Sequence, residues 1–270
     1  MTFIFALGVL ILASIAFKKK ALTVQGTVAS IIIGFLILYG LSLYGLIILA
    51  LFFITSNIIG NLLTSPETKT ASLMEDKGGL RDASQVVANG GWAAASAALY
   101  GITLHPLWLL SFVAAMAAAT SDTWASEIGK KSKRSPVGIF SLKTVPAGQS
   151  GGITVLGNAA GLAGSFFIAG SAFLLQGTVV EPEVYFSVIT ALLIGAAGFA
   201  GQWVDAAAGA LFQALYQCTE CEEITEKTRH CNKKTILIKG NSKITNDLVN
   251  HICTASAVGL VWFFGWIFYI

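Results

Sequence analysis

Long apolar runs alternate with short polar segments along almost the whole chain. A helix rises about 1.5 Å per residue, so about 20 apolar residues cross the hydrocarbon core of a bilayer. The pattern predicts an all-α polytopic membrane protein of about eight transmembrane helices, organised as a single integral membrane domain over residues 1–270. The predicted spans are residues 2–17, 22–40, 42–63, 85–101, 106–128, 151–176, 184–216 and 249–270.

Composition and charge agree with this class. Hydrophobic residues make up 55% of the chain and charged residues only 11%, with a mean hydropathy of +0.73. All 17 Lys and Arg residues lie in the connections after the first, third, fifth and seventh predicted spans. Because cytoplasmic loops carry the excess of Lys and Arg, these connections are expected to be cytoplasmic and both termini outside. We expect a multi-pass protein of a prokaryotic plasma membrane, with no nucleic-acid partner.

The seventh predicted span is too long for a single membrane crossing. A helix over 184–216 would extend about 50 Å, against a hydrocarbon core of about 30 Å. Gly195, Gly198 and Gly201 recur every third residue within it. We therefore expect either a break near residues 198–202 or an extension of this helix into the cytoplasm.

A charged segment precedes the fourth predicted span. Lys77 and Arg81 lead to Asp82, which is expected to cap the helix, and Gln85 and Asn89 then follow on one helical face. If this segment has no functional role, it is a helix cap preceded by an ordinary interfacial loop. The functional interpretation is a polar stripe that leads from the loop into the membrane.

Three acidic residues lie inside or at the edge of apolar spans: Asp122, Glu127 and Asp205. A charge at such a position is costly and usually faces the interior of the helix bundle. Small residues at intervals of four accompany Asp122 and Asp205, which favours close packing against neighbouring helices. With Asp82, these carboxylates lie at the cytoplasmic ends of their spans and would suit a divalent cation that carries phosphates.

Lys143 precedes a Gly-rich turn that opens the sixth predicted span. Backbone N–H groups at a helix start, together with a Lys, can hold phosphate. The chain has neither a GxxxxGK[ST] phosphate loop nor a GxGxxG dinucleotide fingerprint, so any nucleotide site is of another kind.

The cytoplasmic loop 217–248 contains a possible Cys/His metal site. Cys218, Cys221, His230 and Cys231 could supply four ligands to a structural Zn²⁺. The alternative interpretation is a group of reduced cytosolic thiols.

Several segments resemble the signature segments of the transmembrane protein 19-like family. They are Lys77 to Asp82 with Asn89-Gly90, Ser121 to Gly129, Gly148 to Gly152, Val204 to Ala210 with Gln213, and Asn246-Asp247 with Asn250. That family includes the plant phytyl-phosphate kinase of tocopherol synthesis. The resemblance implies a kinase that uses a nucleoside triphosphate, with CTP preferred.

The sequence and the resemblance together predict a membrane kinase that converts an isoprenyl monophosphate, such as phytyl phosphate, into the diphosphate with CTP and Mg²⁺. The alternatives are an ion-coupled transporter, or another CTP-using lipid enzyme such as a cytidylyltransferase. The predicted magnesium ligands are Asp122, Glu127 and Asp205. The other predicted catalytic residues are Lys77, Arg81, Asp82 and Asn89. The predicted substrate-binding and phosphate-binding residues are Lys143, Gly148, Ser150, Gly151, Gly152, Asn158, Asn246, Asp247 and Asn250.

Overall fold

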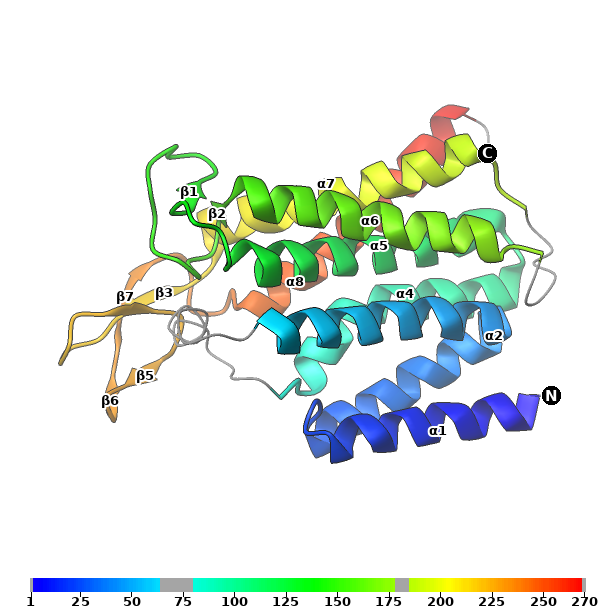
Figure 1. Cartoon of the computed structure of the whole chain (residues 1–270), viewed down its shortest axis with the longest axis horizontal. Helices are drawn as coiled ribbons and strands as arrows, with labels where there is room; N and C mark the ends of the chain where they lie inside the picture. Colours follow the sequence, from blue (N-terminus) through cyan, green and yellow to red (C-terminus); the bar gives the residue numbers. More distant parts are fainter. Residues whose placement is uncertain (1, 64–79, 178–184, 269–270) are drawn as a thin grey trace.

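The computed structural model describes residues 2–63, 80–177 and 185–268. In this part of the chain seven helices form an elongated bundle, and short strands extend from one end of it (Figure 1). Four of the helices, α2, α6, α7 and α8, are long and apolar enough to cross a membrane. The helices are α1 (Thr2–Lys18), α2 (Val24–Leu63), α4 (Ala83–Thr103), α5 (Pro106–Gly129), α6 (Val155–Leu175), α7 (Val188–Phe212) and α8 (Asn246–Phe268).

Helix α5 is the centre of the bundle. It packs against α2, α4, α6, α7 and α8, and every residue from Leu109 to Ser121 is buried. Most of the side chains from Ala114 to Ala119 are alanines, so neighbouring helices approach closely. Protein surrounds α5 on most sides, which explains why it needs less apolar character than the helices at the periphery.

The outermost helix is α1, which packs against α2. Its large apolar side chains Phe3, Ile4 and Leu12 are exposed. An apolar surface of this kind on a bundle with several candidate spans suits contact with lipid.

Helix α2 covers the predicted second and third spans, which are joined without a loop. Its backbone is non-helical at Ser42, with φ 50° and ψ −141°. At this point the chain turns back along the bundle (Figure 1). The predicted boundary between the two spans, residue 41, lies next to this break.

Of the two alternatives predicted for the seventh span, the break near residues 198–202 is wrong. Helix α7 runs without interruption from Val188 to Phe212, a length of 25 residues or about 37 Å. The rest of the apolar run leaves the helix after Phe212 and enters strand β3 (Leu215–Gln217). The residues of the predicted span that follow Phe212 therefore belong to the strands at the end of the bundle. The glycines at 195, 198 and 201 allow close packing of neighbouring helices and do not produce a kink.

The prediction of an all-α fold also needs correction, because short antiparallel strands order two of the polar connections. Strands β1 and β2 pair between α5 and α6; β4, β3 and β7 form one sheet, and β5 pairs with β6. Outside the bundle these segments satisfy backbone N–H and C=O groups by pairing with each other. The strands are β1 (Val137–Gly138), β2 (Gly152–Ile153), β4 (Ile224–Thr225), β5 (Arg229–His230), β6 (Lys233–Lys234) and β7 (Ile236–Lys239).

All of these strands lie at one end of the bundle, where α5 and α7 end and α6 and α8 begin (Figure 1). Helix α1 begins and α8 ends at the opposite end. The polar connections therefore gather around the helix ends that carry the predicted site residues. The predicted catalytic residue Lys77 lies outside the described residues.

Candidate functional site

A cavity of about 600 Å³ opens at the strand-bearing end of the bundle. It is bounded by the first turns of α4, α6 and α8, the last turns of α5 and α7, and the loop before β2. Thirteen of the predicted site residues line it: Arg81, Asn89, Asp122, Glu127, Gly148, Ser150, Gly151, Gly152, Asn158, Asp205, Asn246, Asp247 and Asn250.

Two of the predicted catalytic and phosphate-binding residues in the described part of the chain do not line this cavity. Lys143 is exposed on the loop between β1 and β2. Asp82 is the N-cap of α4: its carboxylate accepts a hydrogen bond from the Gln85 N–H at 3.0 Å, and Gln85 Oε1 accepts from the Asp82 N–H at 3.2 Å. This capping box confirms the predicted start of the helix. A catalytic role for Asp82 or Lys143 stays a prediction.

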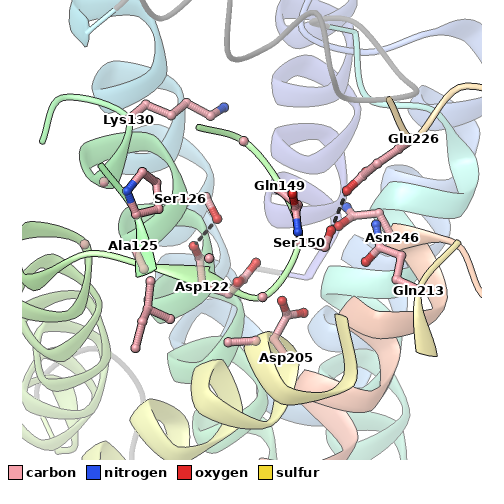
Figure 2. Close-up of a pocket in the computed structure, with 18 of the residues that line it drawn as sticks. Asp122, Ala125, Ser126, Lys130, Gln149, Ser150, Asp205, Gln213, Glu226 and Asn246 are labelled. Atoms are coloured by element: carbon pink, nitrogen blue, oxygen red, sulfur yellow. Dashed lines mark hydrogen bonds between the residues drawn. The ribbon is translucent and has the colours of Figure 1, made fainter. Parts of the chain in front are cut away.

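Asp122 of α5 and Asp205 of α7 lie in the same cavity (Figure 2). Asp205 Oδ1 is buried and has no hydrogen-bond partner among the described residues. Asp122 and Glu226 are near enough to act on Asp205 electrostatically. A buried carboxylate oxygen without a donor, beside two further acids, is an arrangement that a cation would stabilise.

The carboxylates do not, however, form a ready-made ligand cluster. In the described part of the chain, only the Cys/His group brings three or more such ligand atoms within 4.8 Å of one another. Glu127 instead forms an ion pair with Lys130, with 3.2 Å between Oε1 and Nζ. A hard cation at Asp122 and Asp205 would therefore draw its remaining ligands from water or from a substrate.

Positive charge faces the same cavity from two directions. Lys130 is only 9% exposed and lines the cavity from the end of α5 (Figure 2). Arg81 lies over the rings of Phe52 and Phe53, with its guanidinium carbon 5.8 and 6.0 Å from the ring centroids. Its backbone pairs with Ala21 and Thr23 between α1 and α2, which fixes the entry to α4. The two cations could hold an anionic ligand near the carboxylates.

A chain of hydrogen bonds ties together the three helices behind the site. Gln202 of α7 donates from Nε2 to Asn158 Oδ1 of α6 at 3.2 Å, and its Oε1 accepts from Ser121 Oγ of α5 at 3.2 Å. Gly161 makes room for this side chain, since a Cβ there would overlap Gln202 Oε1. The absence of a side chain at Gly161 therefore accommodates a polar side chain as well as a neighbouring helix.

The Gly-rich turn before β2 forms the outer wall of the cavity. Gly151 has a φ of +80°, and a Cβ there would overlap Ala210 of α7, so only glycine fits this turn without strain. Ser150 Oγ donates a hydrogen bond to Glu226 Oε1, from the loop after β4 (Figure 2). Gln213 also faces the cavity, and neither its Nε2 nor its Oε1 has a partner among the described residues. Together these groups offer backbone and side-chain donors to a ligand.

The sequence did not single out Glu226, Gln202 or Lys130 as site residues. Lys130 stands in a run of basic residues that by itself suggests only topology, and Glu226 stands in a polar loop with no motif around it. Gln202 could have been predicted, because it lies three residues before Asp205 inside an apolar span. A side-chain amide there is costly unless it is hydrogen-bonded.

The Cys/His cluster forms a second centre outside the cavity. Its four ligand atoms lie within 4.8 Å of one another. Cys218 Sγ accepts a hydrogen bond from the Glu220 N–H at 3.4 Å, and backbone N–H groups of Cys221 and Glu220 lower the pKa of Cys218 to about 6. The predicted ligands are thus brought together, and the group could bind a metal such as Zn²⁺.

A mostly helical bundle with several candidate spans and a polar cavity at one end defines a multi-pass integral membrane protein. Residues 7–258 match the family model of the integral membrane protein DUF92, and the chain belongs to this family, which is transmembrane protein 19-like. The predicted resemblance is thereby confirmed.

Curated relatives agree with this assignment. The chain is 34% identical over 215 residues to an uncharacterized membrane protein of Methanocaldococcus jannaschii, an alignment that covers 78% of this chain and 83% of the relative. It is 28% identical over 170 residues to the protein VTE6, chloroplastic, of Arabidopsis thaliana, covering 60% of this chain and 50% of that protein. It is also 26% identical over 255 residues to the Arabidopsis thaliana protein PGR, covering 88% and 86%. No solved structure matches the chain.

Proposed function

We propose that the protein is a membrane kinase that transfers a phosphoryl group from a nucleoside triphosphate, with CTP preferred, to an isoprenyl monophosphate. The observation that carries the proposal is the buried, unpartnered oxygen of Asp205 beside Asp122, in a cavity that also presents Lys130 and Arg81. Phosphoryl transfer needs this combination of carboxylates for a metal ion and cations for phosphate oxygens. Membership in a family that resemblance links to phytyl-phosphate kinase supports the same reaction.

The carboxylates suit Mg²⁺ that arrives with the nucleotide. Mg²⁺ is usually held by one or two carboxylates plus substrate phosphates and water, and not by a cage of protein ligands alone. Asp122 and Asp205 would supply the carboxylates, and the ion would neutralise charge on the phosphates during transfer. Glu127 would either position Lys130 through their ion pair or be a further ligand of the magnesium ion.

The remaining residues would bind and orient the two substrates. Arg81 and Lys130 would contact phosphate oxygens, with Lys77 and Lys143 as further predicted candidates. The turn at Gly148 to Gly152 would add backbone N–H groups. Asn89 and Asn158 would orient the substrates from α4 and α6, and Asn246, Asp247 and Asn250 would do so from the start of α8.

The reaction requires little proton transfer from the protein. An oxygen of the acceptor phosphate attacks the terminal phosphorus of the nucleotide, the bond to the bridging oxygen breaks, and the nucleoside diphosphate leaves. Because the attacking group is already an oxyanion, no hydroxyl has to be deprotonated. The absence of a histidine from the cavity lining in the described part of the chain is compatible with this chemistry.

The position of the cavity suits a lipid acceptor and a soluble donor. The acceptor would place its phosphate at the polar end of the bundle and its isoprenyl chain in the bilayer between helices. The basic connections favour a cytoplasmic location for this end, where nucleoside triphosphates are available.

The test is a reaction of purified protein with CTP, Mg²⁺ and a panel of prenyl monophosphates. A label on the terminal phosphate of CTP should appear in prenyl diphosphate. A label on the phosphate nearest the ribose should instead enter the lipid if the protein is a cytidylyltransferase. If neither label enters lipid with any acceptor or nucleotide, the kinase proposal fails, and an ion-coupled transporter becomes the better interpretation of the buried acids.

A further inference from the structure

The loop that carries Glu226 lies between the two halves of the Cys/His cluster. Cys218 and Cys221 precede it, His230 and Cys231 follow it, and Ser150 of the Gly-rich turn donates a hydrogen bond to Glu226. We infer that this cluster binds a structural Zn²⁺, which holds the loop closed and keeps Glu226 in the wall of the cavity.

The distances within the cluster fit a tetrahedral zinc ion. Zn–S bonds of about 2.3 Å and Zn–N bonds of about 2.0–2.1 Å at tetrahedral angles place two sulfurs about 3.8 Å apart and a sulfur and a nitrogen about 3.6 Å apart. The Sγ atoms of Cys221 and Cys231 are 3.8 Å apart. His230 Nδ1 is 3.4 Å from each of these sulfurs. The same sulfur separation is far too long for a disulfide, whose S–S bond is about 2.05 Å.

The surroundings of the ligands match those of metal-bound thiolates and imidazoles. Cys218 is nearly fully buried, and its sulfur accepts the Glu220 N–H. His230 turns Nδ1 toward the sulfurs, and its other nitrogen, Nε2, faces Glu223 Oε2 at 4.0 Å. This separation is longer than a hydrogen bond, so Glu223 would support the ring by electrostatic attraction and not as a bonded partner. The donor set of three thiolates and one imidazole selects zinc over hard cations.

Short strands hold the backbone around the cluster. Strands β4, β5 and β6 are two residues each, and Cys231 and Asn232 both have positive φ, at 49° and 58°. These two residues form the turn of the β5–β6 hairpin, where positive φ is common for Asn but costly for Cys, and an isolated two-stranded hairpin is marginal in water. A metal ion would supply the missing stabilisation, since binding to such a site contributes directly to folding.

Metal content is the first test. Protein purified under reducing conditions should contain about one Zn²⁺ per chain, and Cys221→Ser should lose most of it. The matched control is Cys253→Ser, which changes a buried cysteine of α8 outside the cluster and should leave the zinc content unchanged. The zinc site is refuted if wild type contains no zinc and takes up none from an equimolar solution, or if peptide mapping shows a disulfide between Cys221 and Cys231.

The structural role is tested by limited proteolysis. Arg229 lies between the two halves of the cluster and Lys233 and Lys234 follow soon after it, and all three are exposed trypsin sites. Cleavage there should be slow in wild type and in Cys253→Ser. It should rise about tenfold in Cys221→Ser, because cleavage follows the population of the opened loop. Equal cleavage in all three proteins would show that the ion does not hold the loop.

A separate measurement tests whether the zinc site controls the wall of the cavity. In a Ser150→Cys variant, maleimide labelling at position 150, measured by peptide mass spectrometry, should be slow while the loop is closed. Addition of Cys221→Ser should accelerate it. If the labelling rate at position 150 does not change, zinc does not control this wall. None of these measurements uses nucleotide or lipid, so their outcome is independent of the proposed kinase activity.

Discussion

The Nε2 of Gln202 donates a hydrogen bond to Oδ1 of Asn158 across 3.2 Å, joining α7 to α6 one turn before Asp205. The Oε1 atom of the same side chain accepts from Ser121 of α5, the residue before Asp122. The positions of the two aspartates are therefore coupled through one buried amide. Changes that displace Gln202 should disturb the site even where they touch no substrate.

Gly161→Ala is expected to destabilise the bundle. The added Cβ would overlap Gln202 Oε1 and force it from its partners, and overpacking of this kind typically costs about 1–3 kcal/mol. The measurement is thermal unfolding of the detergent-solubilised protein. Gly170→Ala is the control on the same helix, because nothing lies within 4 Å of a Cβ at that position. Equal unfolding temperatures for the two variants would show that the close approach of Gly161 to Gln202 is not required.

Asp122→Asn and Asp205→Asn should each insert and fold, since both remove a charge at the end of an apolar helix and keep the size of the side chain. Turnover should fall by at least about 100-fold, because charge stabilisation of phosphoryl transfer is worth several kcal/mol. The measurement is prenyl diphosphate formation across a Mg²⁺ titration, with the exposed loop variant Glu222→Gln as control. Near wild-type turnover of Asp122→Asn at limiting Mg²⁺ would mean that Asp122 is structural.

Lys130 and its neighbour Lys131 distinguish phosphate binding from general positive charge. Lys130 lines the cavity and Lys131 does not. Lys130→Ala should lower kcat/KM for the nucleotide by about tenfold or more, since removal of one charge-assisted contact costs about 1.5–3 kcal/mol. Lys131→Ala carries the same change in net charge and should stay near wild type. If both variants lose activity equally, the lysines act through the overall positive charge of the loop, and Lys130 makes no specific contact with phosphate.

The orientation of the bundle can be tested by labelling single introduced cysteines. Ser132→Cys, beside the cavity, should react with an impermeant maleimide only in inverted membrane vesicles. Thr103→Cys, at the last residue of α4 and at the opposite end of the bundle, should react in intact cells. Wild-type protein supplies the background from the native cysteines. Reaction of Ser132→Cys in intact cells would place the cavity outside the cytoplasm and remove the basis for a cytoplasmic nucleotide.

Local signals in the chain predicted the helices and several of their boundaries. The apolar runs located α1, both halves of α2, α4 and α5, and Asp82 caps α4 as its side-chain chemistry requires. The spacing of Cys218, Cys221, His230 and Cys231 predicted a cluster that the fold assembles. Each of these features depends on residues near one another in sequence, so hydropathy, capping chemistry and ligand spacing are sufficient to find them.

The extent of the seventh span could not be found in this way. The apolar run continues through Leu215 and Tyr216, but both residues are buried in strand β3 and not in a longer α7. Hydropathy indicates that a segment is buried but not whether it is a helix or a strand. A buried strand that follows a helix is therefore predicted as a continuation of the helix. The glycines of α7 have the same ambiguity, since glycine serves both kinks and close packing.

By itself the sequence determined the class of protein, because only helices satisfy their own backbone in lipid and long apolar runs have no other stable state in a membrane. It also determined which acids lie at the ends of apolar spans. Only the tertiary structure decided which groups meet. Ser150 and Glu226 are 76 residues apart, and Ser121 and Gln202 are 81 apart. Contacts at such separations depend on how helices pack and on where small residues let them approach, and no local pattern contains that information.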